Sequence, residues 1–84
     1  MATRQVVSIE EVNAWMTREL QQAEDCEESV LTVKYRLQEP DETGCNWSEG
    51  TLRPGPNTNA KHAWPIASNI VARAQSLFNL KDEN

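Results

Sequence analysis

The first pattern of apolar and polar positions begins after Val7 and has the period of a helix. Apolar side chains recur at intervals of three or four residues and therefore share one helical face: Ile9, Val12, Met16, Leu20 and Ala23. Ser8 and Glu11 have the spacing of a capping box, in which each side chain binds the other residue's backbone N–H. Acidic residues from Glu24 onward crowd the negative end of the helix dipole. The pattern therefore predicts a helix over about residues 9–23.

A different pattern, an alternation of period two, follows between residues 30 and 38. Its apolar members are Leu31, Val33, Tyr35 and Leu37, and its polar members are Thr32, Lys34, Arg36 and Gln38. Alternation of this kind, with β-branched and aromatic residues, is typical of a half-buried strand. Residues 39–44 contain Pro, Asp and Gly, which favour a turn, and a weaker alternation follows them. We predict an antiparallel hairpin with strands over about 30–38 and 45–52.

Regular structure is interrupted at residues 53–59, which contain two prolines and a glycine. A second helical stripe of apolar residues follows this loop and comprises Ile66, Ala67, Ile70, Val71, Ala74, Leu77 and Phe78. Pro65 fits the first turn of a helix, where its missing N–H is harmless. We therefore predict a helix over about residues 65–80, with an earlier turn over residues 60–64 as an alternative start.

The predicted order of elements is helix, strand, strand, helix, with residues 5–7 as a candidate short N-terminal strand. A two-stranded hairpin is marginal alone, so the two helices must cover its apolar face. The sequence thus predicts one small α+β domain over residues 1–84, a two-layer α-β-β-α fold in which an antiparallel β-hairpin packs against two helices. Two strands leave open edges, and we therefore expect a homodimer that joins hairpins edge to edge.

The orientation of Trp47 depends on the register of this hairpin. In one register Lys34 lies opposite Glu49 and Arg36 lies opposite Trp47, which offers an ion pair and a cation–π contact and leaves the indole on the outer face. A slip of one residue turns Trp47 toward the helices. Burial is favoured because an exposed indole is costly without a partner and the chain has few aromatic residues. Both orientations remain open at this point.

Composition limits the class of protein. The chain has 84 residues, of which 38% are hydrophobic, and a formal net charge of −5. No apolar run approaches the ~20 residues that span a bilayer, and the first residues lack the apolar segment of a secretion signal. We expect a cytoplasmic protein with reduced thiols and no membrane partner. The acidic balance also argues against a general nucleic-acid binder.

Candidate catalytic and metal-ligating residues are few. The only histidine is His62. Cys26 precedes the first predicted strand and Cys45 lies opposite its far end, roughly 25 Å away at ~3.3 Å per residue. This separation excludes a disulfide and disfavours a shared metal site. The chain also has no glycine motif of the kind that binds phosphates. We therefore expect no enzyme activity, no metal and no cofactor.

Charge is distributed unevenly. Residues 1–50 carry 4 basic and 11 acidic groups, net −7, whereas residues 51–84 carry 4 basic and 2 acidic groups, net +2. The stretch from residue 53 to residue 64 has no acid and contains Arg53, Lys61, His62 and Trp64. Basic and aromatic groups contact phosphates and bases, so weak nucleic-acid binding by this stretch is the alternative function.

The α-β-β-α order, with Lys61 and His62 at the start of the last helix, also resembles a double-stranded-RNA-binding domain. That resemblance implies RNA binding, and the chain departs from it by its missing third strand and its acidic charge. A short acidic α+β chain without catalytic residues is similar, in general character, to small accessory proteins of bacteria and their phages.

The leading prediction is a non-enzymatic interaction or assembly module with a protein partner. It rests on the absence of a catalytic constellation, on the open sheet edges and on the polarised charge. Two contact surfaces are expected. One is the outer hairpin face around Lys34, Arg36 and Trp47, and the other is the stretch that carries Arg53, Lys61, His62 and Trp64.

Overall fold

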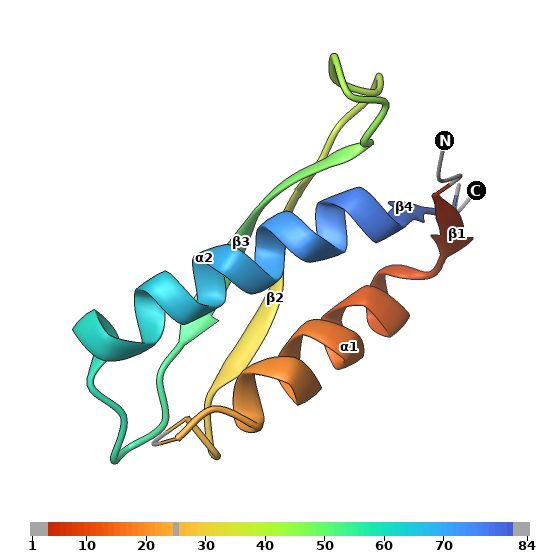
Figure 1. The fold of residues 1–84 in the computed structure, drawn as a ribbon. Helices are drawn as coiled ribbons and strands as arrows, with labels where there is room; N and C mark the ends of the chain where they lie inside the picture. The colour runs from red at the N-terminus through yellow and green to blue at the C-terminus, as the bar shows by residue number, and fades with distance from the viewer. Residues whose placement is uncertain (1–3, 25, 82–84) are drawn as a thin grey trace.

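The computed structural model describes residues 4–24 and 26–81. In chain order its elements are β1 (Gln5–Val7), α1 (Ile9–Gln21), β2 (Val30–Arg36), β3 (Trp47–Arg53), α2 (Ala60–Leu77) and β4 (Phe78–Leu80). β2 and β3 form an antiparallel hairpin, and β1 pairs with β4 in a separate parallel sheet (Figure 1). The α+β class and the hairpin packed with two helices are confirmed.

Helix α1 begins as its sequence predicts. The Ser8 side chain accepts a hydrogen bond from the Glu11 N–H at 3.2 Å and so caps the first turn. The predicted apolar face is the buried one, with Val12, Met16 and Leu20 fully buried. The helix ends at Gln21, two residues before the predicted end. Local signals therefore define this element and the face that it buries.

Helix α2 has the alternative predicted start at residue 60 rather than the start at residue 65, and its end differs from the prediction. It begins at Ala60, where the Asn59 side chain accepts a hydrogen bond from the Lys61 N–H at 2.9 Å. Pro65 therefore lies inside the helix rather than in its first turn. The helix ends at Leu77, and the predicted last turn over residues 78–80 is instead strand β4. The apolar spacing continued through residue 78, but pairing with β1 determines the conformation there.

The short strands join the two ends of the described chain. Val7 pairs with Leu80, and the Lys81 N–H donates to the Val7 carbonyl at 2.7 Å. The Asn46 side chain forms hydrogen bonds with both backbone groups of Leu80, as a neighbouring strand would. It accepts from the Leu80 N–H at 2.7 Å and donates to the Leu80 carbonyl at 2.9 Å. The candidate strand at residues 5–7 is thus confirmed as β1, and β4 is tied to the hairpin.

The core lies between the hairpin and the two helices. Its buried apolar members come from every element and comprise Val7, Val12, Met16, Leu20, Cys26, Leu31, Cys45, Trp47, Ala63, Ala67, Ile70, Ala74 and Leu80. Tyr35, which the alternation assigns to the buried face, is 52% exposed. Its neighbours Lys34 and Arg36 are exposed as well. Burial along β2 is therefore confined to its first half.

The hairpin combines features of both predicted orientations of Trp47. Arg36 lies opposite Trp47, and Lys34 forms an ion pair with Glu49 at 3.9 Å, as in the register that was expected to expose the indole. Trp47 is nevertheless fully buried, and its Nε1–H donates to the Phe78 carbonyl at 3.0 Å. Glu49 has a φ of 59°, a left-handed conformation that interrupts the alternation of the strand. Trp47 is therefore not on the outer face, and its assignment to a contact surface is wrong.

Candidate interaction surface

The two edges of the hairpin are not equivalent, because α1 closes the outer edge of β2. The Thr17 hydroxyl accepts from the Leu31 N–H and donates to the Leu31 carbonyl, both at 3.0 Å. Asn13 Oδ1 accepts from the Val33 N–H at 2.7 Å, and Gln21 Nε2 donates to the Ser29 carbonyl at 3.1 Å. Three side chains of one helix thus replace a neighbouring strand along this edge.

The spacing of these bonds has a geometric basis. The helix residues recur every four positions, which corresponds to about 6 Å of rise, and the strand residues recur every two, which corresponds to about 6.6 Å. Because the helix repeat and the strand repeat are nearly equal, each of the three side chains lies beside its backbone partner over the length of the contact. The polar stripe that contains Thr17 was present in the sequence beside the apolar face of α1, and its spacing of four was the signal that sequence reasoning missed.

The same bonds reveal which backbone groups of β3 face outward. Because Leu31 and Val33 direct their backbone groups to α1, their partners across the hairpin, Leu52 and Gly50, direct theirs away from β2. Among residues 4–24 and 26–81, no side chain forms a hydrogen bond to the backbone of Gly50 or Leu52. The outer edge of β3 is therefore open over this stretch.

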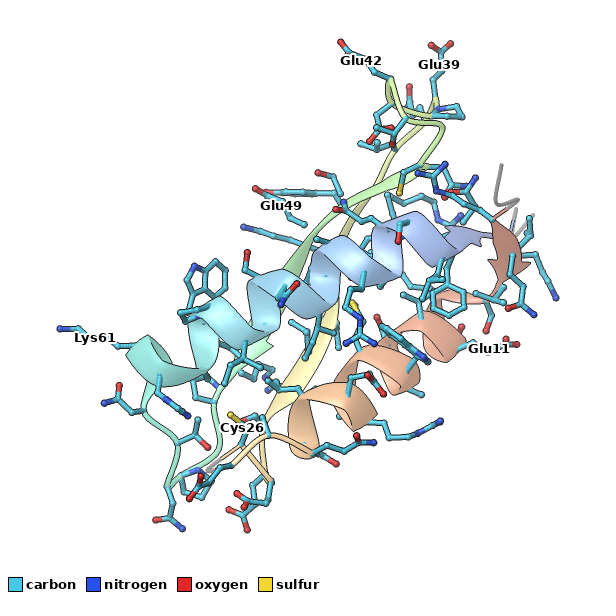
Figure 2. The ribbon with its side chains drawn as sticks, in the orientation of Figure 1. Glu11, Cys26, Glu39, Glu42, Glu49 and Lys61 are labelled. Carbon is cyan, nitrogen blue, oxygen red and sulfur yellow. The ribbon has the colours of Figure 1, made fainter. Side chains whose placement is uncertain are left out.

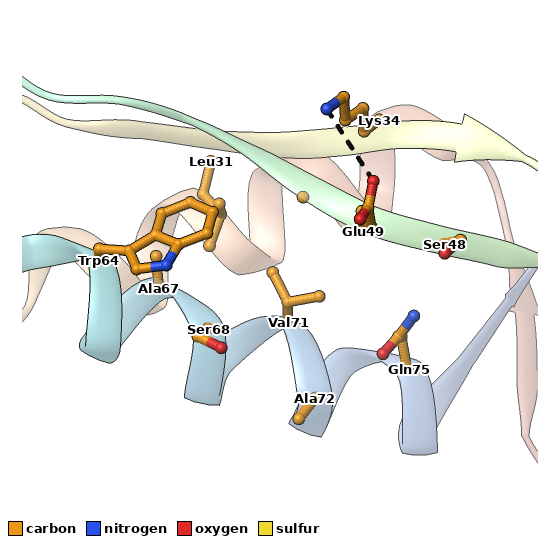
Figure 3. Close-up of a pocket in the computed structure, with 11 residues that line it drawn as sticks. Leu31, Lys34, Ser48, Glu49, Trp64, Ala67, Ser68, Val71, Ala72 and Gln75 are labelled. Atoms are coloured by element: carbon orange, nitrogen blue, oxygen red, sulfur yellow. Dashed lines mark ion pairs between the residues drawn. The ribbon is translucent and has the colours of Figure 1, made fainter.

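A groove of about 550 Å³ lies between the strands and α2, beside Gly50 at this open edge. We call it the edge groove, and Figure 3 shows the residues that line it, from β2, β3 and α2: Leu31, Lys34, Ser48, Glu49, Gly50, Trp64, Ala67, Ser68, Val71, Ala72 and Gln75. Trp64 is 56% exposed, and its ring lies between the helix and the strands (Figure 3). The groove thus offers an aromatic surface beside unpaired strand backbone.

Gly50 is required where β3 passes closest to α2. A methyl group on Gly50 would lie 2.6 Å from Val71 Cγ2, closer than side-chain carbons approach in proteins, and 3.2 Å from Leu31 Cδ1, which is a tight contact. A larger residue would therefore push the strand away from the helix. The absence of a side chain at Gly50 thus permits this close approach.

An apolar hollow of about 540 Å³ lies beside the edge groove. Trp64 lines both, and the hollow is completed by Leu52, Pro54, Ala60, Lys61 and Pro65. The loop below it is held in place by Ser29, whose buried hydroxyl accepts from the Gly55 N–H at 3.1 Å and is 3.2 Å from the Thr58 hydroxyl. Apolar surface therefore continues along β3 from the groove into the hollow.

The structure gathers only some of the predicted contact residues. Lys34 and Trp64 both line the edge groove, and Lys61 and Trp64 both line the hollow. Arg36 lies elsewhere, where its guanidinium donates to the Lys81 carbonyl at 2.9 Å. Arg53 and His62 are exposed but line neither depression. The basic stretch therefore does not form one continuous cluster with its aromatic residue.

The two cysteines are buried and are not joined by a disulfide, as their predicted separation requires. Cys26 lies at the end of the molecule opposite the hairpin loop that carries Glu39 and Glu42 (Figure 2). Burial raises the pKa of the Cys45 thiol, whose Sγ–H donates to the Trp47 carbonyl at 3.3 Å. A buried, protonated thiol is a poor nucleophile.

In the described part of the chain, no three His, Cys, Asp or Glu side chains are grouped so that they could hold a metal ion.

Asp41 organises the hairpin loop. Its Oδ1 accepts hydrogen bonds from the Thr43 N–H at 2.8 Å, the Thr43 hydroxyl at 2.7 Å and the Cys45 N–H at 3.1 Å. The two bonds from Thr43 are the main cause of the lowered pKa of the Asp41 carboxyl. The carboxylate acts here as a structural acceptor that holds the turn leading into β3.

Comparison of the chain with protein-family models, with curated proteins and with solved structures gives no match. Within residues 4–24 and 26–81, neither α1 nor α2 is both long and apolar enough to cross a membrane.

Proposed function

We propose that this chain is a non-enzymatic interaction or assembly module that binds an extended segment of a protein along the outer edge of β3. The observation that carries the proposal is the inequality of the two hairpin edges. Three side chains of α1 close the β2 edge, whereas the backbone of Gly50 and Leu52 is left open beside the edge groove. An uncovered strand edge is a template for a further strand.

The chemistry of the surface suits strand addition. The N–H and carbonyl groups of Gly50 and Leu52 supply main-chain hydrogen bonds, which bind any extended sequence. Side chains of the added strand that point toward α2 enter the edge groove, where Trp64 and Val71 offer apolar contact. Aromatic residues of this kind are enriched at protein interfaces. Backbone pairing supplies affinity, and the groove supplies selectivity.

The residues that would be needed for catalysis support the same conclusion. Cys45 is buried with its thiol pKa raised, and Cys26 is buried as well, whereas His62 lies on the exposed start of α2. Nucleophilic catalysis requires an accessible nucleophile beside a base. The open strand edge therefore remains the strongest functional feature of the molecule.

The test compares capture by a tagged chain and by two matched variants in native lysate, with quantitative mass spectrometry as the readout. Ser68→Phe places a bulky side chain in the edge groove, whereas Asn69→Phe places the same side chain on the neighbouring exposed position of α2, outside the groove. We expect captured proteins, including untagged copies of the chain, that are retained by the Asn69 variant and lost from the Ser68 variant. Equal capture by both variants, or no capture, would show that the groove is not a binding surface.

A further inference from the structure

The structure also indicates what occupies this edge. We infer that it is a second copy of the same chain, whose β3 pairs antiparallel with the first β3 about a two-fold axis at Thr51. The inference rests on the proposed function, because it requires the β3 edge to accept a strand. A symmetric dimer uses the same patch on both subunits, so the patch must be complementary to itself. Three features of residues 49–54 meet this requirement.

The first feature is the length of regular edge, which selects the register. On one side it ends at Glu49, whose left-handed φ of 59° breaks the strand. On the other side it ends at Pro54, which has no N–H to donate. A two-fold axis at Gly50 would require regular pairing at residue 48, beyond the break. An axis at Leu52 would place Gly50 opposite Pro54. Only an axis at Thr51 pairs Gly50 of each copy with Leu52 of the other. Each of these two pairs exchanges two backbone hydrogen bonds, and all four bonds lie within the regular stretch.

The second feature is charge. With the axis at Thr51, Glu49 of each copy lies at the end of the paired stretch, across from Arg53 of the other, and unlike charges across an antiparallel pair stabilise it. Lys34 already approaches Glu49 from the β2 side, with their charged groups 3.9 Å apart. Each carboxylate would then lie between two cations in one row across the four strands. At the centre of the ribbon, Thr51 meets Thr51, a pair that carries no charge.

The third feature is shape. Gly50 has no side chain and lets β3 lie close against α2, because a side chain there would collide with Val71. In the selected register, Leu52 of the second copy lies opposite Gly50 and directs its side chain toward α2. That side chain enters the edge groove between Trp64 and Val71. The smallest residue of one copy thus faces an apolar residue of the other, and the two-fold axis repeats the contact.

The first experiment measures the mass of the chain by sedimentation equilibrium over a range of concentrations. We expect twice the 9.5 kDa of one chain for the wild type. Thr51→Lys places two like charges opposite each other at the axis and should weaken the dimer at least about tenfold. Thr32→Lys is the matched control, because Thr32 is the cross-strand neighbour of Thr51 and lies one strand away from the edge. A monomeric wild type, or equal weakening by the two variants, overturns the inference.

The second experiment exchanges the charges. Glu49→Arg and Arg53→Glu each place like charges opposite one another and should dissociate the dimer, whereas the double variant should restore it. The ion pair of Glu49 with Lys34 is lost in both the Glu49 single variant and the double variant, so restoration cannot come from within one subunit. Thermal melts of each variant verify folding. Failure of the double variant to dimerise while folded refutes the selected register.

These experiments separate the two proposals. A monomeric chain that still captures another protein through the edge groove would overturn the second-copy inference and leave the proposed function intact. A chain that neither dimerises nor binds through the groove would refute both.

Discussion

The strongest test of the edge arrangement is the removal of one hydroxyl from α1. Thr17→Val keeps the shape of the side chain but replaces the group that both accepts from the Leu31 N–H and donates to the Leu31 carbonyl. Leu31 is fully buried, so solvent does not compensate for the lost bonds. The substitution isolates the contribution of helix-to-strand hydrogen bonding to the stability of the domain.

The expected magnitude follows from the groups left behind. An unsatisfied buried backbone group costs about 1–3 kcal/mol, and here a donor and an acceptor are affected together. We expect a loss of about 2–3 kcal/mol in the free energy of unfolding, which is a large fraction of the stability of a domain of this size. Thr17→Ser retains the hydroxyl and loses only a methyl group, which should cost about 0.8 kcal/mol.

Urea denaturation measured by tryptophan fluorescence provides the assay, because Trp47 is buried in the core. With a slope of about 1 kcal/mol per molar urea, the Val variant should unfold at a urea concentration about 2–3 M lower than the wild type. Val and Ser variants of equal stability would show that the hydroxyl bonds contribute nothing and that α1 covers the β2 edge by packing alone. In that case, the contrast between the two hairpin edges would lose its physical basis.

Two further outcomes can be checked independently. Gly55→Ala should destabilise the fold by about 2 kcal/mol in the same urea assay, because a methyl group on Gly55 would lie 2.7 Å from Glu28 Cβ and 2.9 Å from its carbonyl carbon; a neutral result would mean that the 53–59 loop moves freely away from residue 28. The folded-state pKa of Asp41 lies below the ordinary value of 3.8, so its carboxylate contributes stability that is fully present above pH 3.8 and is lost as the pH falls through the folded pKa. Carbon-detected NMR titration should show this lowered pKa, and Thr43→Val should raise it toward the ordinary value; an unchanged pKa in that variant would contradict the assigned cause.

Much of the fold could be predicted because it follows from local signals. Ser8 and Glu11 mark the start of α1 independently of the rest of the chain, and the period of two identifies β2 from its own residues. Charge complementarity between Lys34 and Glu49 supported one of the two registers that the sequence left open, and that register is the observed one. In each case the interacting groups are adjacent in sequence or in one supersecondary unit, so spacing alone is informative.

The failures have tertiary causes. The helical apolar spacing reaches Phe78, and only pairing with β1 from the opposite end of the sequence turns residues 78–80 into a strand. The orientation of Trp47 depends on the left-handed backbone of Glu49, a residue type that does not favour this conformation. The edge groove depends on the separation between β3 and α2, which Gly50 and Val71 determine through space. No spacing rule encodes that distance.

The parallel pairing of β1 with β4 has a consequence for the order in which the molecule forms and opens. This pairing brings together residues from nearly opposite ends of the described chain. The loss of chain entropy on closing so long a loop is large until the intervening segments are compact, so the pairing becomes favourable only after they have folded. The three-residue β1–β4 ladder should therefore form last during folding and open first in the folded protein. Amide hydrogen exchange at Val7 and Leu80 should therefore be faster than in β2. Substitutions that weaken the β1–β4 pairing should accelerate unfolding and leave the refolding rate almost unchanged.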